Sequence, residues 1–293
     1  MNGTVLVTGS GGFIGSRLLS WLNQRSVDAK GWTRRNVDME DRAAVAAALG
    51  RLQPAAIFHC AAVPARASDD DWHLVARECA MLDALAEAQP EGAVLIYCGS
   101  VAEIGHAGVH DEMIWCRPQT LYGMAKYAAR NRALALAATG RAVRVARLFG
   151  VYGTGEGPQR LIPALVTQLV QGKPVELSDG SQIRDFVHVD DVCEALWRFA
   201  NVRQDTSPTL LNIGTGQGVT VAGVCRAVAS VLGADSSLLR FGAIPRRHVD
   251  EQILVADCGL LAKTLSLHLP QHTAGFGAKF VDYVNALAST ARN

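Results

Sequence analysis

Tyr122 and Lys126 have the residue types and the spacing needed for proton transfer. They lie at the start of an alanine-rich segment that is expected to be helical, so they would share one helix face. A tyrosine side chain has an ordinary pKa of about 10, and it exchanges protons near neutral pH only when a nearby cation stabilises the phenolate. Lys126 can supply that cation. Tyr122 could then donate a proton to a carbonyl oxygen or accept one from an alcohol, although a Tyr/Lys pair taken alone is more often structural.

Three glycines near the start of the chain have the spacing of a nucleotide-binding turn. Gly9, Gly12 and Gly15 separate a short apolar strand from a predicted helix. Gly9 would allow a tight turn, Gly12 would let the backbone approach a pyrophosphate, and Gly15 would let the helix pack closely on the sheet. The helix N-terminus, with Phe13 and Ile14, would favour that anion through its amide groups and dipole. Such a motif alone can be an ordinary loop, but the strand before it and the helix after it favour a dinucleotide site.

The elements that would position these residues alternate between short apolar runs and longer helical patterns. This alternation is typical of βαβ units with right-handed crossovers, so we expect an α/β fold with a doubly wound parallel Rossmann sheet. The predicted strands are Val5–Thr8, Ala29–Trp32, Ala56–His59, Ala93–Cys98 and Val143–Phe149. The predicted helices are Phe13–Asn23, Asp41–Leu49, Asp70–Ala88 and Leu121–Ala138.

The pattern changes after Gly150, where a glycine-rich loop is followed by shorter and less regular elements. The segments Arg184–Asp191 and Leu210–Gly216 resemble chain that returns to the first sheet. We therefore expect a smaller, interleaved C-terminal substrate lobe. The predicted division assigns residues 1–153 and 186–215 to a dinucleotide-binding domain, and residues 154–185 and 216–293 to the substrate-binding lobe.

The composition is that of a compact enzyme. The 293 residues are 49% hydrophobic and 19% charged, and the formal net charge of +1 gives no reason to expect nucleic acid or a membrane surface as a partner. The seven cysteines are scattered without a Cys-x-x-Cys pair, as is typical of a reduced, cytoplasmic protein. We see no secretion signal, no run long enough to span a bilayer and no histidine or cysteine cluster, so we expect no metal.

The order of the glycine motif, Ser100, Tyr122 and Lys126 resembles the extended short-chain dehydrogenase/reductase family, in the branch that acts on nucleotide sugars. The spacing Gly-x-x-Gly-x-x-Gly differs from the Gly-x-Gly-x-x-Gly of ordinary dehydrogenases. The resemblance covers nearly the whole chain, from Thr4 to about Leu265. It implies that Ser100 lies at the carboxyl end of the fourth strand and forms a hydrogen bond with the reacting oxygen, beside Tyr122 and Lys126.

The resemblance also implies a nicotinamide cofactor. In this fold the end of the second strand faces the adenosine ribose, where NAD-binding members usually carry an acid. Thr33 takes that place here, followed by Arg34 and Arg35, whose guanidinium groups match a 2′-phosphate. We therefore expect NADP(H) in preference to NAD(H), although a solvated arginine pair is the alternative. The other cofactor contacts implied by the resemblance are Asp38 and Met39 at the adenine, and Ala61 and Ala62 beneath the cofactor.

Two arginines would hold the substrate if the resemblance extends to the nucleotide sugar. Arg184 begins the segment Arg-Asp-Phe-Val-His-Val-Asp-Asp, which is close to a signature of the nucleotide-sugar branch, and Arg247 aligns with a second arginine of that branch. Guanidinium groups from two segments could clamp a nucleoside diphosphate. A buried ion pair of Arg184 with Asp185 or Asp190 is the alternative.

The chain departs from the family pattern at positions that bear on the reaction. Nucleotide-sugar 4,6-dehydratases carry an Asp-Glu pair directly after their Ser/Thr, because removal of water needs an additional acid and base. Val101 and Ala102 stand there, and Glu103 is expected to point elsewhere. Dehydration is therefore disfavoured. As a separate departure, Leu74 occupies the position of the family's supporting asparagine.

The leading hypothesis is an NADPH-dependent reductase of a 4-keto nucleotide deoxysugar, in which Tyr122 protonates the oxygen as hydride reaches the carbon. A nucleotide-sugar 4-epimerase with tightly bound NAD would use the same residues and stays open. A non-catalytic NAD(P)-sensing protein is a third hypothesis, disfavoured by the intact Ser100, Tyr122 and Lys126. By family analogy we expect a homodimer formed through the helices over Asp70–Ala88 and Leu121–Ala138.

Overall fold

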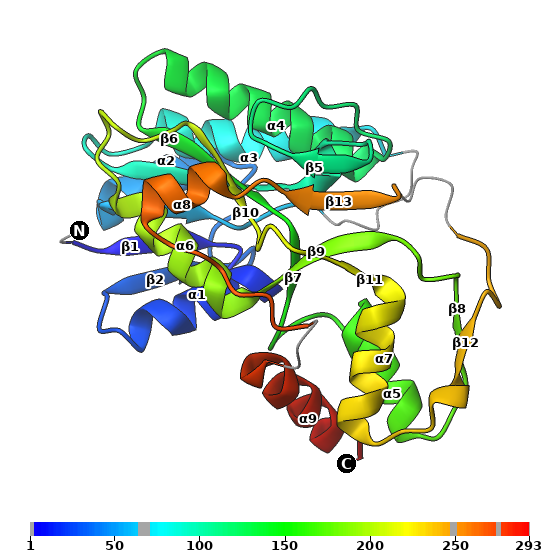
Figure 1. The fold of residues 1–293 in the computed structure, drawn as a ribbon. Coiled ribbons are helices and arrows are strands. Elements are labelled where there is room, and N and C mark those ends of the chain that lie inside the picture. Colours follow the sequence, from blue (N-terminus) through cyan, green and yellow to red (C-terminus); the bar gives the residue numbers. More distant parts are fainter. Residues whose placement is uncertain (1–2, 64–70, 247–250, 274–276, 293) are drawn as a thin grey trace.

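The structure, a computed structural model, describes residues 3–63, 71–246, 251–273 and 277–292. Its elements form two groups that lie side by side (Figure 1). The first group has strands β1 (Val5–Thr8), β2 (Ala29–Trp32), β3 (Ala56–His59), β4 (Val94–Ser100), β6 (Val143–Leu148) and β10 (Leu210–Ile213), and helices α1 (Phe13–Asn23), α2 (Arg42–Leu52), α3 (His73–Glu87), α4 (Leu121–Ala138), α6 (Val189–Asn201) and α8 (Gly259–Leu265).

The second group begins within the first half of the chain. Its strands are β5 (Gly108–His110), β7 (Gly150–Tyr152), β8 (Val175–Leu177), β9 (Ile183–His188), β11 (Gly218–Thr220), β12 (Leu239–Phe241) and β13 (Ile253–Ala256), and its helices are α5 (Leu161–Val170), α7 (Val221–Leu232) and α9 (Ala278–Arg292). Short 3₁₀ turns, η1 (Val101–Glu103) and η2 (Ser236–Leu238), complete the elements.

The first group is built on a six-stranded parallel sheet with the strand order β10-β6-β4-β3-β1-β2. Alternate side chains enter the two cores on its faces. Val5 and Val7 of β1 join the core under α1, α6 and α8, whereas Leu6 joins the core under α2, α3 and α4. This doubly wound parallel sheet with helices on both faces confirms the fold class expected from the sequence.

Most predicted elements lie where the sequence pattern placed them. The predicted first three strands and the helices over Phe13–Asn23 and Leu121–Ala138 agree with β1, β2, β3, α1 and α4. The second helix begins one residue later than predicted because Asp41 caps it, accepting a hydrogen bond from Ala44 N at 3.0 Å. The fourth strand extends beyond the predicted Cys98 to Ser100. The predicted start of α3 at Asp70 lies outside the described residues.

The second group packs around β9. This strand pairs with β7 and β13 in parallel and with β11 antiparallel, and β13 continues to β5. Helices α5, α7 and α9 share a separate core, and lie apart from the six-stranded sheet in Figure 1. The chain thus passes repeatedly between the two groups, while the predicted domain boundaries stay a prediction.

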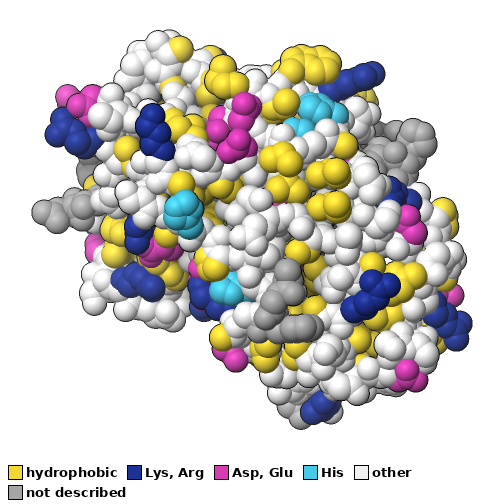
Figure 2. All heavy atoms as spheres, viewed as in Figure 1, with side chains coloured by type: hydrophobic (Ala, Val, Ile, Leu, Met, Phe, Trp, Pro, Cys, Tyr) yellow, Lys and Arg dark blue, Asp and Glu magenta, His cyan; other side chains and the backbone are white. Residues whose placement is uncertain are grey.

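On the face seen in Figure 2, charged side chains are dispersed and form no basic patch.

A buried ionic cluster fixes the chain directly after β4. Arg147 of β6 is completely buried, and its Nε donates to Glu103 Oε1 at 2.5 Å. Its Nη1 donates to Asn212 Oδ1 at 3.1 Å and to the carbonyl oxygen of Asp111 at 3.3 Å. Because Glu103 lies three residues after Ser100, the cluster holds the turn that carries Ser100 against the neighbouring strands.

Removal of the Arg147 guanidinium should destabilise the protein strongly. In Arg147→Met the Glu103 carboxylate stays buried without its main partner, and we expect a loss of about 3–5 kcal/mol in the free energy of unfolding, measured by denaturant titration. The matched control is Arg203→Met, which breaks the exposed Arg203–Asp205 pair, and should leave the unfolding midpoint unchanged. Equal midpoints for the Arg147 variant and the unsubstituted protein would contradict this role.

Candidate active site

The turn after β1 and the first turn of α1 each have one position that accepts only glycine. Gly9 has φ of +65°, and a Cβ there would lie 2.5 Å from the backbone nitrogen of Ala61. A Cβ on Gly15 would lie 2.3 Å from the carbonyl oxygen of Gly9. These close approaches let α1 begin directly over the ends of β1 and β3. Gly12 caps α1 without a side-chain hydrogen bond, so no side chain covers the amide groups of the first turn.

A cavity of about 530 Å³ lies over this turn. Of the predicted cofactor residues, those that line it are Gly9, Gly12, Phe13, Ile14, Gly15, Arg34, Asp38, Met39, Ala61 and Ala62. Arg35 is not among its lining residues, and its backbone nitrogen donates to Thr33 Oγ1. The cavity offers glycine backbone without side chains, the uncovered N-terminal amide groups of α1, and the cation of Arg34. A dinucleotide has phosphates that these groups can bind, so the residues present fit the cofactor expected from the sequence.

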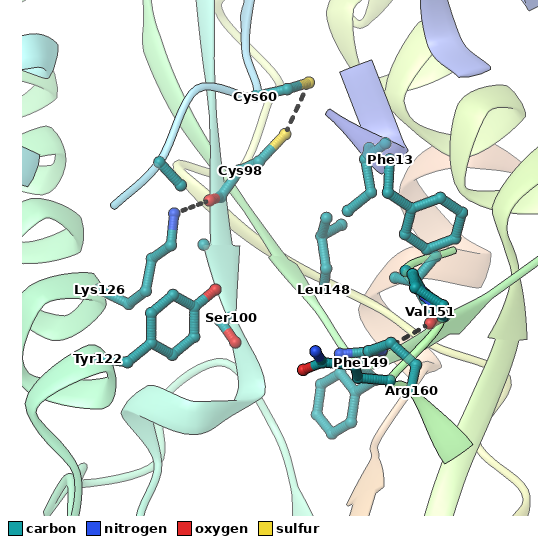
Figure 3. Close-up of a pocket in the computed structure, with 16 residues that line it drawn as sticks. Phe13, Cys60, Cys98, Ser100, Tyr122, Lys126, Leu148, Phe149, Val151 and Arg160 are labelled. Carbon is teal, nitrogen blue, oxygen red and sulfur yellow. Dashed lines mark hydrogen bonds between the residues drawn. The ribbon is translucent and has the colours of Figure 1, made fainter. Parts of the chain in front are cut away.

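A second cavity of about 570 Å³ continues from the first. Both are lined by Phe13, Ile14, Cys60 and Ala62, so the two form one groove along the carboxyl ends of β1, β3 and β4. Ser100, Tyr122 and Lys126 all line the second cavity, and Figure 3 shows their side chains together at one side of it. A ligand that occupies the whole groove would extend from the glycine turn to the proton-transfer residues.

A glycine contact brings Tyr122 and Ser100 together. Ser100 ends β4, and its Oγ accepts a hydrogen bond from Ala102 N at 3.2 Å. The first turn of α4 packs on this 3₁₀ turn, where a Cβ on Gly123 would lie 2.4 Å from the carbonyl oxygen of Ala102. Thr120 caps α4 by accepting from Gly123 N at 3.0 Å. The residue after Tyr122 must therefore be small for the phenol to lie beside the end of β4.

Lys126 is a buried cation close to Tyr122, one turn further along α4. Its side chain is only 4% exposed, and its Nζ lies 5.9 Å from the centre of the Tyr122 ring. Nζ donates to the carbonyl oxygen of Cys98 at 3.0 Å and to Glu78 Oε1 at 2.6 Å. Burial alone would lower the pKa of Lys126, but the charge of Glu78, its hydrogen bond and the other negative groups nearby together outweigh burial, and the pKa is raised. The ammonium therefore stays charged at neutral pH, as stabilisation of a phenolate requires.

The sequence analysis missed Glu78. It lies on the buried face of α3 between Leu74 and Leu82, at helical spacing. An acidic residue at such a position is the signal that could have indicated a buried partner for a cation. Leu74, at the position of the family's supporting asparagine, is buried in the core under α2, α3 and α4.

Cys60 and Cys98 face one another in the second cavity, with Sγ atoms 3.6 Å apart (Figure 3). The hydrogen bond between them and their burial raise the pKa of Cys60 well above its ordinary value, so this thiol stays protonated. His59 precedes Cys60 and is completely buried, with Nδ1 2.8 Å from Thr8 Oγ1. Burial lowers the pKa of His59 to about 4, so its ring is neutral at neutral pH.

The predicted substrate arginines lie away from the catalytic cavity or outside the described residues. Arg184 is on β9, where its Nη1 donates to the carbonyl oxygen of Ile183, and it does not line either cavity. Arg247 lies outside the described residues. Arg160, which the sequence analysis missed, does line the catalytic cavity, and its Nη2 donates to the carbonyl oxygen of Val151 at 3.0 Å.

The acids considered as partners of Arg184 have other contacts in the structure. Asp185 accepts hydrogen bonds from Thr215 and from Gly216 N, and Asp190 pairs with Arg17.

Among the described residues no group of three or more histidine, cysteine, aspartate or glutamate side chains could hold a metal ion. None of the helices described is both long enough and apolar enough to cross a membrane.

Comparisons with known proteins extend over most of the chain. The model of the NAD dependent epimerase/dehydratase family matches residues 5–214. CDP-abequose synthase from Salmonella typhimurium is 35% identical over 114 residues, which span 38% of this chain and 38% of that protein. dTDP-4-dehydro-6-deoxy-D-allose reductase from Streptomyces bikiniensis is 25% identical over 78% of this chain and 81% of its own length. The solved structure of MoeE5 in complex with UDP-glucuronic acid and NAD is 31% identical, with coverage of 97% and 99% and a TM-score of 0.84.

His59 should make stability fall in weak acid. The unfolded ring binds a proton below its ordinary pKa of about 6.5, whereas the folded ring stays neutral down to about 4, so the unfolded state binds more protons in that range. Between pH 7.5 and pH 5.0 this costs about 2 kcal/mol of unfolding free energy.

The variant His59→Phe should therefore lose about 2 kcal/mol less than the unsubstituted protein between these two pH values, as measured by urea unfolding at each pH. His188, whose pKa burial also lowers to about 4, stays in both proteins and contributes equally. The exposed His268, changed to Gln, provides the control and should leave the pH dependence as it was. An identical loss of stability in His59→Phe would show this explanation to be wrong.

Proposed function

The chain belongs to the NAD dependent epimerase/dehydratase family, and from this membership we propose that it reduces the 4-keto group of a nucleotide deoxysugar with NADPH. The observation that carries the proposal is the convergence of Ser100, Tyr122 and Lys126 on one cavity that continues into the glycine-lined groove. The relatives described above are named for nucleotide-linked sugars, and the family description and the MoeE5 complex both name NAD. The choice of reduction, of NADPH and of a deoxysugar is the part proposed here.

The chain's own residues would perform the proton transfer. The bound nicotinamide supplies or accepts hydride. Tyr122 donates its phenolic proton to the carbonyl oxygen of the sugar as negative charge develops there. Ser100 Oγ donates a hydrogen bond to the same oxygen and orients it. Lys126, held in place by the Cys98 carbonyl and Glu78, stabilises the phenolate left on Tyr122.

Apolar side chains keep water away from the reacting carbon. The cavity is lined opposite Ser100 and Tyr122 by Phe13, Leu148, Phe149 and Val151 (Figure 3). Ile14, at the start of α1, also lines it. Exclusion of water strengthens the interaction of Lys126 with a developing phenolate, because the local dielectric constant falls. This wall also suits a sugar that presents a methyl group in place of a hydroxyl.

The residues directly after Ser100 favour reduction over dehydration. Val101 and Ala102 begin the 3₁₀ turn η1 and carry no acid or base. The nearest acid after them, Glu103, is bonded to Arg147 and does not line the cavity. The similarity to dTDP-4-dehydro-6-deoxy-D-allose reductase supports the same choice.

The proposed preference for NADPH rests on the end of β2. Thr33 and Arg34 line the groove there, and the nearest acid of the lining, Asp38, comes four residues after Arg34. A guanidinium can pair bidentately with a 2′-phosphate, whereas a carboxylate in the same place would repel it.

We further propose that Arg184 and Arg247 bind the substrate pyrophosphate, and that Arg160 contacts the part of the substrate nearest the reacting carbon.

A 4-epimerase remains a second candidate, because the Tyr122 phenolate can take a proton from an alcohol in the reverse direction and the family description names epimerases. An epimerase retains its cofactor through the catalytic cycle. Protein that carries bound NAD after purification and does not consume added NADPH would favour this candidate.

Loss of the Tyr122 hydroxyl should abolish reduction but not cofactor binding. We expect Tyr122→Phe to lower kcat for NADPH-dependent reduction of a 4-keto-6-deoxy sugar nucleotide by about 10²–10⁴-fold, with little change in NADPH affinity. The measurement is NADPH absorbance across CDP-, dTDP-, GDP- and UDP-linked substrates. Tyr127→Phe, on the same helix outside the cavity, is the matched control and should keep normal turnover. Normal turnover by Tyr122→Phe would reject the proposed role.

The two arginines after β2 should differ in their effect on cofactor choice. Arg34→Ala should weaken NADPH binding by about 10–100-fold while changing NADH binding little, because one charge-assisted contact with the 2′-phosphate is lost. Arg35→Ala should weaken NADPH binding less, since Arg35 does not line the groove. Calorimetric titration with both cofactors measures the effect. An equal loss for NADPH and NADH in Arg34→Ala would contradict 2′-phosphate recognition.

A further inference from the structure

A buried carboxylate lies behind the catalytic cavity. Glu78 of α3 is completely buried, and it does not line either cavity of the groove. Its Oε1 accepts hydrogen bonds from Lys126 Nζ at 2.6 Å and from the Tyr97 hydroxyl at 2.9 Å, and its Oε2 accepts from Val63 N at 2.8 Å. Donors from three separate segments thus fix both oxygens in place.

Glu78 and Lys126 are both charged. Burial would raise the pKa of Glu78, but the adjacent Lys126 charge and its hydrogen bond outweigh that effect and the pKa is lowered. A single charge at this depth would be very costly, whereas two opposite charges at hydrogen-bond distance offset one another. The side chain of each residue therefore depends on the other for its place in the core.

The contacts of Lys126 leave it little freedom. An ammonium has three N–H donors, and two of them are directed to Glu78 and to the Cys98 carbonyl. The same Nζ lies 4.9 Å from the centre of the Tyr97 ring and 5.9 Å from that of Tyr122. One donor remains for a group in the cavity, and the position of the cation relative to Tyr122 is set from behind by Glu78.

Three other titratable groups packed around Lys126, those of His59, Cys60 and Tyr97, are neutral. His59 of β3 is neutral because burial lowers its pKa to about 4, and the Cys60 thiol is protonated because burial and its bond to Cys98 raise its pKa. Burial and the Glu78 charge raise the pKa of Tyr97 well above its ordinary value. Glu103, on the turn after β4, is bonded to Arg147. Of the carboxylates in the described part of the chain, Glu78 is the one that bonds Lys126.

We propose that Glu78 is a positioning residue that anchors Lys126 near Tyr122 and keeps its ammonium charged, and so sets the pH at which Tyr122 exchanges its proton. Without that carboxylate, burial would lower the pKa of Lys126, and a neutral amine no longer stabilises a phenolate on Tyr122. Glu78 thus maintains the charge that makes Tyr122 acidic enough to donate its proton. This inference rests on the proposed function only through the role of Tyr122 as the proton donor.

The test is a titration of Tyr122 that needs no turnover. Tyrosine ionisation is followed by ultraviolet difference absorbance from pH 6 to 11 in the purified protein, and the curve of the same protein carrying Tyr122→Phe is subtracted. In Glu78→Gln, which keeps the size of the side chain and removes its charge, the ionisation midpoint of Tyr122 should move to higher pH by about one unit, because Lys126 loses the partner that keeps it charged. The pH limit of the reduction should move in the same direction.

Two further variants separate charge from packing. Tyr97→Phe removes one hydrogen bond from Glu78 but leaves both charges, so the Tyr122 midpoint should stay where it is even if the protein is less stable. Glu78→Asp keeps the charge but withdraws the carboxylate from Lys126, so the midpoint should move in the same direction as in Glu78→Gln by a smaller amount. This variant carries the test if Glu78→Gln does not fold.

An unchanged or lower midpoint in the Glu78 variants overturns the proposal, even if kcat falls, because a merely structural role would lower stability or turnover without moving the titration. The outcome is independent of the substrate. If no 4-keto sugar nucleotide is reduced, the proposed function fails, but the Tyr122 titration still reports whether Glu78 controls its ionisation.

Discussion

The buried ammonium of Lys126 constrains the whole site, because a charge in the protein interior must be paired and hydrogen-bonded. Its partners come from different layers of the fold. Glu78 is supplied by α3, and the Cys98 carbonyl by the end of β4. Lys126 itself is on α4, so the ion pair joins two helices on one face of the sheet, and the hydrogen bond to Cys98 ties them to the central strand β4. The position of the cation is therefore a property of the packed fold and not of one flexible side chain.

Glycine contacts determine how closely the remaining elements approach this cation. Gly9 lets the first turn reach Ala61, Gly15 lets α1 lie over that turn, and Gly123 lets α4 pack against Ala102. Each of these positions would place a Cβ within 2.6 Å of backbone. The groove for a dinucleotide and the pair Ser100 and Tyr122 are thus products of the same close backbone packing. Such a site is held rigidly, which favours precise alignment of donor and acceptor atoms.

The sequence predicted the elements with strong local signals and missed those that depend on distant partners. Strands β1, β2 and β3 were predicted to the residue, because short apolar runs between turns leave little ambiguity. The three-residue strand β5 was not predicted, since its pairing with β13 joins segments more than 140 residues apart and leaves no periodic pattern. Glu78 was missed for a similar reason. An isolated glutamate in a helix is indistinguishable from a solvated one until its neighbours in the fold are known.

The most direct measurement is a crystal structure of the protein with NADP⁺ and a nucleoside-diphosphate deoxysugar bound. The account predicts that the hydroxyl groups of Tyr122 and Ser100 both lie within about 3.2 Å of the oxygen on carbon 4 of the sugar, with that carbon facing the nicotinamide. It also predicts that Lys126 keeps its bonds to Glu78 and the Cys98 carbonyl. A complex in which the Tyr122 hydroxyl points away from the sugar, or in which another side chain contacts that oxygen in its place, would contradict the account.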